Sequence, residues 1–247
     1  MYKKNKLMEL LKELRLKGFL ENYEEITSQE NKSIDEIMLE LCEIEAEKRY
    51  SDRIKRKIRQ ASFPKMKTLA MIDYKKAPKL PKQKIEKLAT CEFINKKENV
   101  VLVGDSGGGK THLAIALGVE ACKRDYKVKF FTACQLVNIL VEEYENKTIE
   151  KFMNKLKKYP LIVVDELGYI PFSQKGGELL FQVFSNRYES GSIIVTSNLH
   201  FSKWSEIFIK EDMTAALLDR LIHHATIIKY DWGSIRFNES RKKMKNR

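Results

Sequence analysis

The stretch Val100–His112, V-V-L-V-G-D-S-G-G-G-K-T-H, decides the fold class of this chain. Four apolar residues lead into the pattern G-x-x-x-x-G-K-[ST], which begins at Gly104 and ends at Thr111 without a gap. The apolar run Leu113–Leu117 follows almost directly. A buried strand, a glycine-rich turn and a helix start, in this order, are the setting in which the pattern marks a phosphate-binding loop.

The residue types of this loop suit a triphosphate and a magnesium ion. Glycines reach backbone angles that let successive N–H groups point at an anion, and the N-terminus of the following helix adds positive potential. The Lys110 side chain can reach the β- and γ-phosphates, and the Thr111 hydroxyl can bind Mg²⁺. The expected cofactor-binding residues are Gly104, Asp105, Ser106, Gly107, Gly108, Gly109, Lys110, Thr111 and His112.

The net charge of +12 is carried outside this nucleotide-binding core. Residues 1–98 contain 24 Lys and Arg against 17 Asp and Glu, residues 99–235 contain 16 of each, and residues 236–247 contain six against one. Basic flanks around a neutral core indicate nucleic acid as a polyanionic partner, although an ordinary lysine-rich surface explains the totals equally well.

Residues 1–62 have a helical pattern, in which Gly18 is expected to interrupt or end the first helix. Ser33 and Glu36 form a capping-box signal before an amphipathic helix that runs into S-D-R-I-K-R-K-I-R-Q, residues 51–60. The cations of this helix can contact a phosphate backbone, or they form an ordinary solvated helix face. The candidate DNA-binding residues are Arg53, Lys55, Arg56, Lys57 and Arg59.

The rest of the chain alternates helices with short apolar strands. Phe63-Pro64 ends the basic helix. A lysine-rich linker follows, in which Ile72-Asp73-Tyr74 is a candidate to fold against the core, and a helix over 85–94 leads into the first strand. Further strands are expected at 128–131, 161–164, 192–196 and 225–230, with helices at 135–145, 149–158, 177–188 and 213–224.

This alternation predicts an α/β domain whose central parallel sheet is covered by helices on both faces. A small all-α region precedes it. The expected domains are 1–63, helical and basic; 64–84, the linker; 85–236, the nucleotide-binding core; and 237–247, a basic tail without structure of its own.

Two acidic residues follow the apolar strand at 161–164. Asp165 lies at the carboxyl end of the strand, on the ligand side of an open α/β sheet, where it can bind Mg²⁺ together with Thr111. Glu166 can orient and polarise an attacking water. Capping of the next turn is the alternative for both acids. The polar residues that end the next strand and can bond a γ-phosphate or this water are Thr196, Ser197 and Asn198.

Arg220 lies late in the helix at 213–224 and is a candidate arginine finger for the ATP of a neighbouring subunit. The alternative is a surface ion pair with Asp219, which contributes little. The adjacent His223 and His224 point to different faces of the helix, which argues against a shared metal ion.

The four cysteines form no C-x-x-C motif and are expected to be reduced thiols. Charged residues near the N-terminus leave no apolar signal segment, and no apolar run is long enough to span a bilayer. We therefore expect a cytoplasmic protein without a membrane partner.

Five stretches together resemble the IstB family, the ATP-binding helper proteins that bacterial insertion sequences encode beside a transposase. They are G-D-S-G-G-G-K-T-H-L-A, V-V-D-E-L-G-Y-I-P-F, G-G-E-L-L-F-Q-V-F-S-N-R-Y-E, I-V-T-S-N and T-A-A-L-L-D-R-L-I-H-H-A-T. A-S-F-P-K-M-K-T-L at 61–69 extends the resemblance toward the N-terminus. The family consists of AAA+ P-loop NTPases similar to the loaders of the bacterial replicative helicase.

The resemblance implies roles for matching residues. Asp165 and Glu166 would be the Mg²⁺-binding and water-activating acids, Asn198 the first sensor, and Arg220 a residue that acts in trans within an ATP-dependent homo-oligomer. The family assembles on DNA with ATP and presents target DNA to its transposase. Duplex DNA and a transposase are thus the expected partners, with the basic helices and linker as the DNA-facing surface. No helical lid domain is expected after the last strand, and Arg236 is the one late candidate for a second sensor.

Two loop positions depart from the family pattern. Asp105 stands where Pro is frequent, and Gly108 stands where Thr is frequent. An acid near phosphates should weaken binding unless it faces outward or caps the helix, and Gly108 adds flexibility that costs entropy on ordering. Neither change removes a phosphate or metal ligand.

The leading interpretation is a Mg-dependent ATP hydrolase that regulates transposition through DNA and a transposase. A helicase loader shares the core and would prefer single-stranded DNA. A small-molecule kinase needs an acceptor site and a mobile lid, for which no residues stand out, and a GTPase is disfavoured because no N-K-x-D motif occurs. A nucleotide-gated DNA-binding module with little turnover is also compatible with Asp105.

Overall fold

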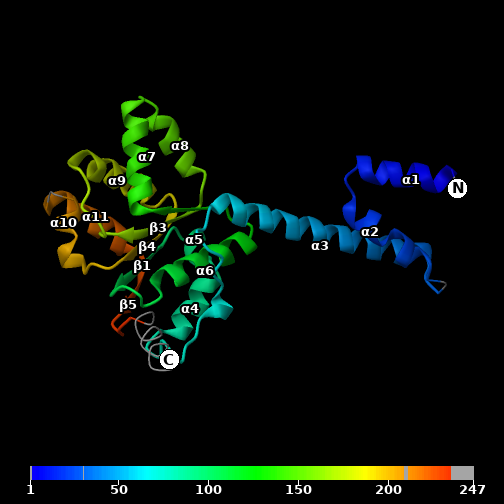
Figure 1. Cartoon of the computed structure of the whole chain (residues 1–247), viewed down its shortest axis with the longest axis horizontal. Coiled ribbons are helices and arrows are strands. Elements are labelled where there is room, and N and C mark those ends of the chain that lie inside the picture. The colour runs from blue at the N-terminus through cyan, green and yellow to red at the C-terminus, as the bar shows by residue number, and fades with distance from the viewer. Residues whose placement is uncertain (1, 30, 209–210, 235–247) are drawn as a thin grey trace, which may run out of the picture. The chain divides into compact units, whose positions relative to one another are not determined.

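The computed structural model describes residues 2–29, 31–208 and 211–234 (Figure 1). By its packing the chain consists of two units, Met1–Arg56 and Lys57–Arg247, and the division falls inside helix α3 (Ile34–Ala61). The domain boundaries expected from the sequence stay predictions. Arg236 and the basic tail lie outside the described residues.

The first unit contains α1 (Tyr2–Glu13), α2 (Lys17–Thr27) and α3 up to Arg56. Each helix contributes a buried apolar residue, respectively Leu11, Ile26 and Leu41. The capping box is confirmed, because the Ser33 N–H donates to the Glu36 carboxylate at 2.7 Å and the Glu36 N–H donates to Ser33 Oγ at 3.3 Å. The helical prediction for this region is therefore confirmed.

The predicted role of Gly18 as a helix break is wrong. The chain leaves α1 at Leu14–Leu16, where Arg15 takes a φ of 56°, and Gly18 is the second residue of α2. Glycine is needed there for packing, since a β-carbon would lie 2.8 Å from the Cα of Glu45. The Gly18 N–H donates to the buried Glu45 carboxylate at 2.6 Å. Sequence periodicity cannot show such a contact between helices.

The second unit is built on five strands, and the strands expected from the sequence are all confirmed. They are β1 (Asn99–Gly104), β2 (Val128–Thr132), β3 (Leu161–Leu167), β4 (Ser192–Ser197) and β5 (Ala225–Tyr230). The helices are α4 (Lys82–Ala89), α5 (Glu92–Asn95), α6 (Lys110–Lys123), α7 (Ala133–Glu145), α8 (Ile149–Lys157), α9 (Gln174–Arg187), α10 (Ser205–Phe208) and α11 (Glu211–His223), with 3₁₀ turns at Leu69–Met71 and Phe201–Lys203. Within the described part of the chain, no helix has the length and apolar content needed to cross a bilayer.

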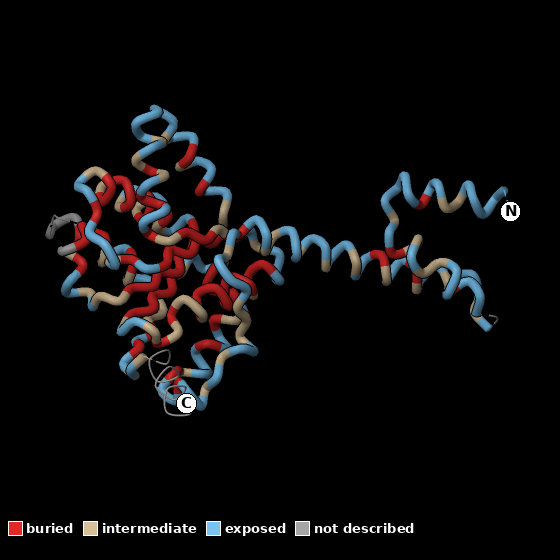
Figure 2. The backbone as a smooth tube through the Cα atoms, in the orientation of Figure 1, coloured by how far each residue is buried: buried red, intermediate tan, exposed pale blue. Residues whose placement is uncertain are grey.

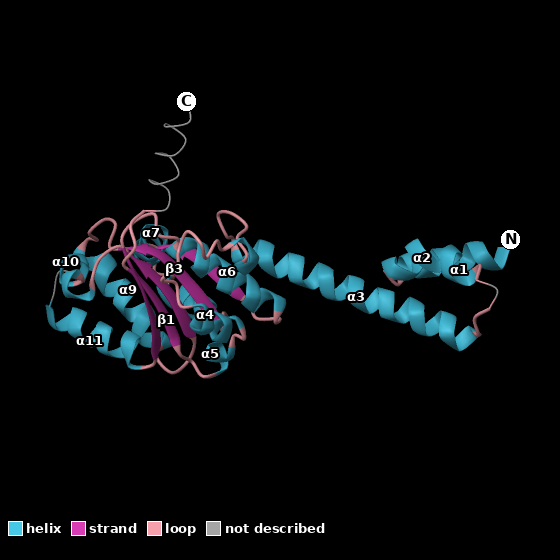
Figure 3. Ribbon diagram, turned by 90° about the horizontal axis from the view of Figure 1, so that it is seen from below, coloured by secondary structure: helices cyan, strands magenta, loops and turns pink. Residues whose placement is uncertain are grey.

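All five strands run parallel in the order β2-β3-β4-β1-β5. Figure 3 shows the sheet with α9 and α11 on one side and α4 and α6 on the other. In this register Val101 of β1 lies beside Val195 of β4 and Ile227 of β5. Parallel neighbours require crossover connections, which the helices supply. The carboxyl ends of β1, β3 and β4 therefore meet at one edge of the sheet, where open α/β sheets bind ligands.

Alternate residues of the strands face two separate hydrophobic cores. On β1, Val100 and Leu102 pack with α4, α5 and α6, whereas Val101 and Val103 pack with α7 to α11. Figure 2 shows the central strands as largely buried tube. Burial on both faces is the physical reason why these strands read as continuous apolar runs rather than as an alternating pattern.

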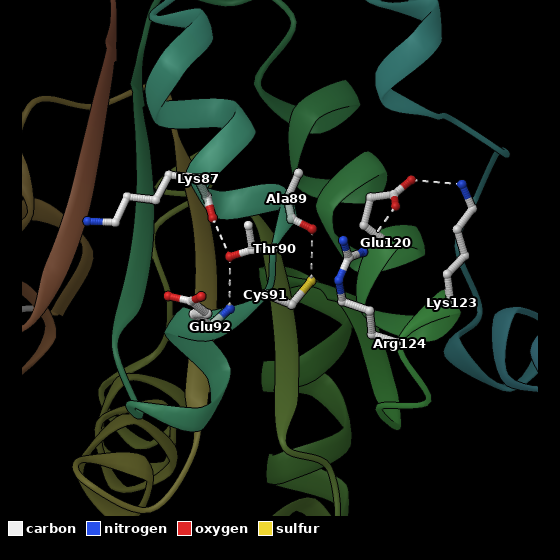
Figure 4. Close-up of polar contacts among 8 residues, drawn as sticks. All are labelled: Lys87, Ala89, Thr90, Cys91, Glu92, Glu120, Lys123 and Arg124. Atoms are coloured by element: carbon white, nitrogen blue, oxygen red, sulfur yellow. Dashed lines mark hydrogen bonds and ion pairs between the residues drawn. The ribbon is translucent and has the colours of Figure 1, made fainter.

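The single helix predicted over 85–94 is wrong, because α4 ends at Ala89 and α5 begins at Glu92. Cys91 between them has a φ of 61°. The Thr90 hydroxyl donates to the carbonyl of Lys87 at 2.8 Å and accepts the N–H of Glu92 at 3.4 Å (Figure 4). One side chain thus serves the end of one helix and the start of the next, a local effect that apolar spacing does not reveal.

Helices α7 and α9 begin earlier than predicted because a hydroxyl caps each N-terminus. Thr132 accepts the N–H of Gln135 at 3.2 Å, and Ser173 accepts the N–H of Gly176 at 3.1 Å. The helix expected at 135–145 thus begins at Ala133, and the one expected at 177–188 begins at Gln174.

Arg187, at the end of α9, is buried and has no acidic partner among the described residues. Burial lowers its pKa to about 10. Its two terminal nitrogens donate to backbone carbonyls at 2.9 to 3.2 Å, whereas Nε is buried without a hydrogen-bond partner within the described residues; the carbonyls are those of Leu156, Tyr159, Pro160 and Ser192. This side chain therefore ties α9 to the amino ends of β3 and β4, at the edge of the sheet away from the phosphate loop.

Candidate nucleotide-binding site

The phosphate loop joins the end of β1 to the start of α6, as the motif predicts. Gly104, Gly107 and Gly109 have φ values of 130°, 82° and 103°, a region that side chains disfavour. A β-carbon on Gly104 would also lie 2.1 Å from the carbonyl oxygen of Tyr230. Positive φ angles explain why glycine occupies these three positions, and at Gly104 the close approach of the Tyr230 carbonyl oxygen is a second reason.

Lys110 is the first residue of α6, and only 8% of it is exposed. Its ammonium donates to the carbonyl of Gly104 and, at 2.7 Å, to that of Asp105. The charge is therefore held against the loop, at a helix N-terminus whose positive potential adds to it. An anion bound in the loop would interact with both the Lys110 ammonium and the positive potential of the helix N-terminus.

The two positions that depart from the family pattern are accommodated. Asp105 is exposed and is not part of the wall of the cavity over the loop, so its carboxylate faces outward. Gly108 is buried, and a β-carbon there would lie 3.1 Å from Cδ1 of Tyr230. Glycine at this position therefore matches the packing of the Tyr230 ring against the loop.

The end of β3 brings Asp165 to the loop. Thr111 Oγ1 donates to Asp165 Oδ1 at 3.0 Å, and Thr196 Oγ1 donates to the same oxygen. Burial raises the pKa of Asp165 above its usual value, and the two hydroxyls oppose this shift. A desolvated carboxylate and a hydroxyl thus face each other, as oxygen ligands of one divalent cation do.

Glu166 has an unusual backbone conformation, with a φ of 62°. The pairing of β3 with β4 shifts register between Val164 and Leu167, and the Glu166 N–H donates to Thr196 Oγ1 at 2.9 Å. A non-glycine residue in this region costs about 1–3 kcal/mol, and such strain concentrates at functional sites. The exposed side chain of Glu166 borders the cavity over the loop.

This cavity has a volume of about 600 Å³. The loop from Ser106 to His112 and the side chains of Glu166, Thr196 and Asn198 form its polar wall. The opposite wall was not predicted as part of the site. It comes from the linker, with apolar contributions from Met71, Ile72, Ala77 and Leu80. The apolar pair Ile72 and Tyr74 in a lysine-rich segment was the available signal, and both side chains do pack on the core.

Comparison with known proteins agrees with this geometry. Residues 9–243 match the family model described as IstB-like ATP binding protein. The chain belongs to the IstB-like ATP-binding protein family. An insertion-sequence protein of Geobacillus stearothermophilus, named for IS5376 and for ATP binding, is 37% identical over 217 residues, which are 88% of this chain and 86% of that one. The IS21 protein of Pseudomonas aeruginosa, named in the same way, is 36% identical over 194 residues, with 78% and 73% covered.

The core of this IstB-like protein has the AAA+ P-loop fold. A solved DNA replication initiation factor superposes with a TM-score of 0.53 at 25% identity, over 74% of this chain and 55% of that one. The structure of DnaI superposes with a TM-score of 0.52 at 20% identity, over 68% and 89%. The chain therefore spans little more than half the length of the initiation factor.

Of the two residues to which the IstB resemblance gives sensor and trans-acting roles, Asn198 lines the cavity and Arg220 does not. Asn198 Oδ1 is buried and has no hydrogen-bond partner within the described residues. Arg220 is exposed on α11, donates to Ser185 Oγ at 2.6 Å and lies 5.6 Å from the centroid of the Phe181 ring. Both roles stay predictions.

The candidate DNA-binding cations all lie on α3. The guanidinium of Arg53 lies 5.6 Å from the centroid of the Tyr50 ring. Lys57 forms an ion pair with Asp125 at 2.7 Å, and only 13% of its side chain is exposed. The exposed cations are Arg53, Lys55, Arg56 and Arg59. DNA binding by all five stays a prediction, and Lys57 already has an acidic partner within the second unit.

Proposed function

We infer that the protein is an ATP-dependent, DNA-binding ATPase that assembles on duplex DNA, delivers target DNA to the transposase of its own mobile element and regulates that transposase. Family membership supports the ATP and the insertion-sequence context. The observation that carries the hydrolytic part is the meeting of Thr111, Asp165 and Thr196 at one edge of the sheet, with Glu166 bordering the adjoining cavity.

A magnesium ion fits the donor set. The Asp165 carboxylate and the Thr111 hydroxyl are hard oxygen ligands 3.0 Å apart, and these two residues would hold the ion. Among the described residues, no group of three or more His, Cys, Asp and Glu side chains is placed to bind a metal, so protein ligands alone would not complete the shell of the ion. Phosphate oxygens and water would supply the remaining ligands. Bound there, Mg²⁺ neutralises charge on the β- and γ-phosphates.

Side chains and backbone groups of this chain bind the phosphates and position the attacking water. The loop N–H groups and Lys110 bind the phosphates, and Glu166 orients and polarises the attacking water. The unpaired Asn198 Oδ1 can accept a hydrogen bond from that water. Arg220 of a neighbouring copy would complete the site from outside and stabilise the charge that develops on the transferred phosphate.

The distribution of charge supports the DNA-binding part of the proposal. Residues 51–98 contain 15 Lys and Arg against five Asp and Glu, whereas residues 1–50 contain nine against 12. The basic excess of the N-terminal region is therefore concentrated in the last part of α3 and the segment that follows it. Exposed cations on a helix bind the phosphate backbone without reading the base sequence.

ATP turnover measured without DNA, with duplex DNA and with single-stranded DNA tests this function, and we expect duplex DNA to stimulate it most. Glu166→Gln should keep ATP affinity, lose turnover by about 100-fold or more, and stay bound to DNA. Glu142→Gln, which changes an exposed acid on α7, is the control. Undiminished hydrolysis by the Glu166 variant would reject the role of Glu166.

A helicase loader is the second candidate, because helicase loaders share the AAA+ core with the family to which this chain belongs. Stimulation by single-stranded DNA in preference to duplex DNA, together with binding of a replicative helicase, would favour the loader. ATP binding with negligible turnover under all three conditions would instead indicate a nucleotide-gated DNA-binding module.

A further inference from the structure

The two walls of the nucleotide cavity differ in chemistry. The glycine loop, Lys110 and Thr111 offer N–H groups, an ammonium and a hydroxyl, which suit a triphosphate. The linker wall is mixed: it presents the apolar side chains of Ile72, Ala77 and Leu80, which suit the faces of a base or the carbon atoms of a ribose. The charged residues beside them are Lys65, Lys67, Asp73 and Lys76. A nucleotide that fills the cavity therefore needs both walls in place.

His112 joins the two walls. It follows Thr111 in the first turn of α6, and its ring Nε2 lies 3.0 Å from the carbonyl oxygen of Thr68 in the linker. A carbonyl oxygen only accepts hydrogen bonds, so Nε2 must carry the proton and donate. Both residues are half-buried, which limits the replacement of this bond by water.

The Thr68 carbonyl lies just before the part of the linker that forms the apolar wall. Thr68 precedes the 3₁₀ turn Leu69–Met71, and Met71 and Ile72 then line the cavity. Leu69 and Ile72 pack on the core beside α6, so the hydrogen bond and the apolar contacts act on the same short segment. Without the donor, the Thr68 carbonyl keeps only the Met71 N–H at 3.2 Å, and the turn loses this side-chain tie to α6 while it retains its own backbone hydrogen bonds and its apolar contacts.

We propose that His112 is a positioning residue that holds the linker wall for the nucleoside end of the nucleotide and does not itself bind phosphate. This deepens the proposed function and rests on it. The imidazole bonds to the linker, whereas its neighbours Lys110 and Thr111 bond to the loop and to Asp165. Consecutive residues of one helix turn thus serve opposite walls of the cavity.

Calorimetric titration with ATP and with inorganic tripolyphosphate, both with Mg²⁺, separates the two walls. His112→Ala should weaken ATP binding about three- to tenfold, the contribution of one hydrogen bond, and leave tripolyphosphate affinity within about twofold. His112→Gln keeps an N–H donor on a side chain of similar length and should restore most of the ATP affinity. Equal loss for both ligands, or no loss of ATP affinity, would overturn the proposal.

Trypsin digestion of the nucleotide-free full-length protein gives a readout that does not depend on ATP binding. Cleavage after Lys65 and Lys67 in the linker should be faster in His112→Ala than in the wild type, with His112→Gln close to the wild type. Equal linker cleavage in all three proteins would overturn the positioning role. Failure of the wild-type protein to bind ATP would reject the proposed function alone, since the digestion tests the linker contact separately.

Discussion

Lys110 donates to two carbonyls of its own loop, so its charge is already placed where a phosphate would bind. Lys110→Ala should reduce ATP affinity about 100-fold, because it removes a charge-assisted hydrogen bond from a partly desolvated site. Equilibrium binding of a fluorescent ATP analogue measures this loss. Lys123→Ala, which changes an exposed lysine at the other end of α6, should bind normally. Tight binding retained by the Lys110 variant would refute the phosphate-loop assignment.

Arg187 is the residue whose loss should most affect stability without touching the site. Arg187→Met keeps much of the buried stem but removes a donor from four carbonyls, of which those of Leu156 and Pro160 keep a backbone N–H, and should destabilise the second unit by about 2–5 kcal/mol. Urea unfolding, followed by fluorescence of the buried Trp204, measures this loss of stability. Arg124→Met, which removes an exposed partner of Glu120, should cost less than about 1 kcal/mol. Equal losses of stability in the Arg187 and Arg124 variants would contradict the structural role given to Arg187.

At the scale of elements, two helices present cations that have no ion pair within the described residues. Lys55, Arg56 and Arg59 lie on α3, and Lys151, Lys155 and Lys158 recur at helical spacing along α8 and its C-cap. Lys155 also contributes, after burial, to lowering the pKa of Lys129 nearby. Positive charge is therefore concentrated on α8, although residues 99–235 of the core carry no net charge.

Changing Lys55, Arg56 and Arg59 to glutamine should flatten the salt dependence of duplex binding, by about 0.9 in the log–log slope for each phosphate that the variant no longer neutralises. A control set, Lys82, Lys96 and Lys123, removes the same charge from lysines that each pair with an acid three or four residues earlier or later in the chain. Fluorescence anisotropy across a salt series measures the slopes. Equal slopes for the control set and the α3 set would show that the α3 cations form an ordinary solvated helix face and do not contact phosphates.

At the scale of the whole molecule, the role in trans that we propose for Arg220 predicts that oligomerisation is a condition of full activity. Arg220→Ala and Glu166→Gln should each be inactive alone. Random equal mixing should restore turnover at about one quarter of the interfaces, where an intact Glu166 meets an intact Arg220 in a head-to-tail contact. ATPase assays of the mixture with duplex DNA measure this recovery. A mixture as inactive as its components would contradict action in trans.

Much of the fold was predictable because its signals are local. The apolar runs at 161–164 and 192–196 identified buried strands, and the loop motif placed a strand before it and a helix after it. The predictions failed where one contact decides the backbone. Thr90 divides the helix over 85–94 by a side-chain hydrogen bond, and Gly18 permits close approach to Glu45 instead of ending a helix.

The sequence by itself determined the chemistry of this protein. It specified a phosphate loop, two acids after a buried strand, a parallel α/β sheet and a basic N-terminal helix, because each depends on residue types at short, fixed spacing. Only the tertiary structure decided which distant groups meet. It placed Thr196 on the same oxygen as Thr111, turned Asp105 outward, matched Gly108 to Tyr230 and closed the nucleotide cavity with the linker. These contacts join residues far apart in the chain, and no local pattern encodes the packing that brings them together.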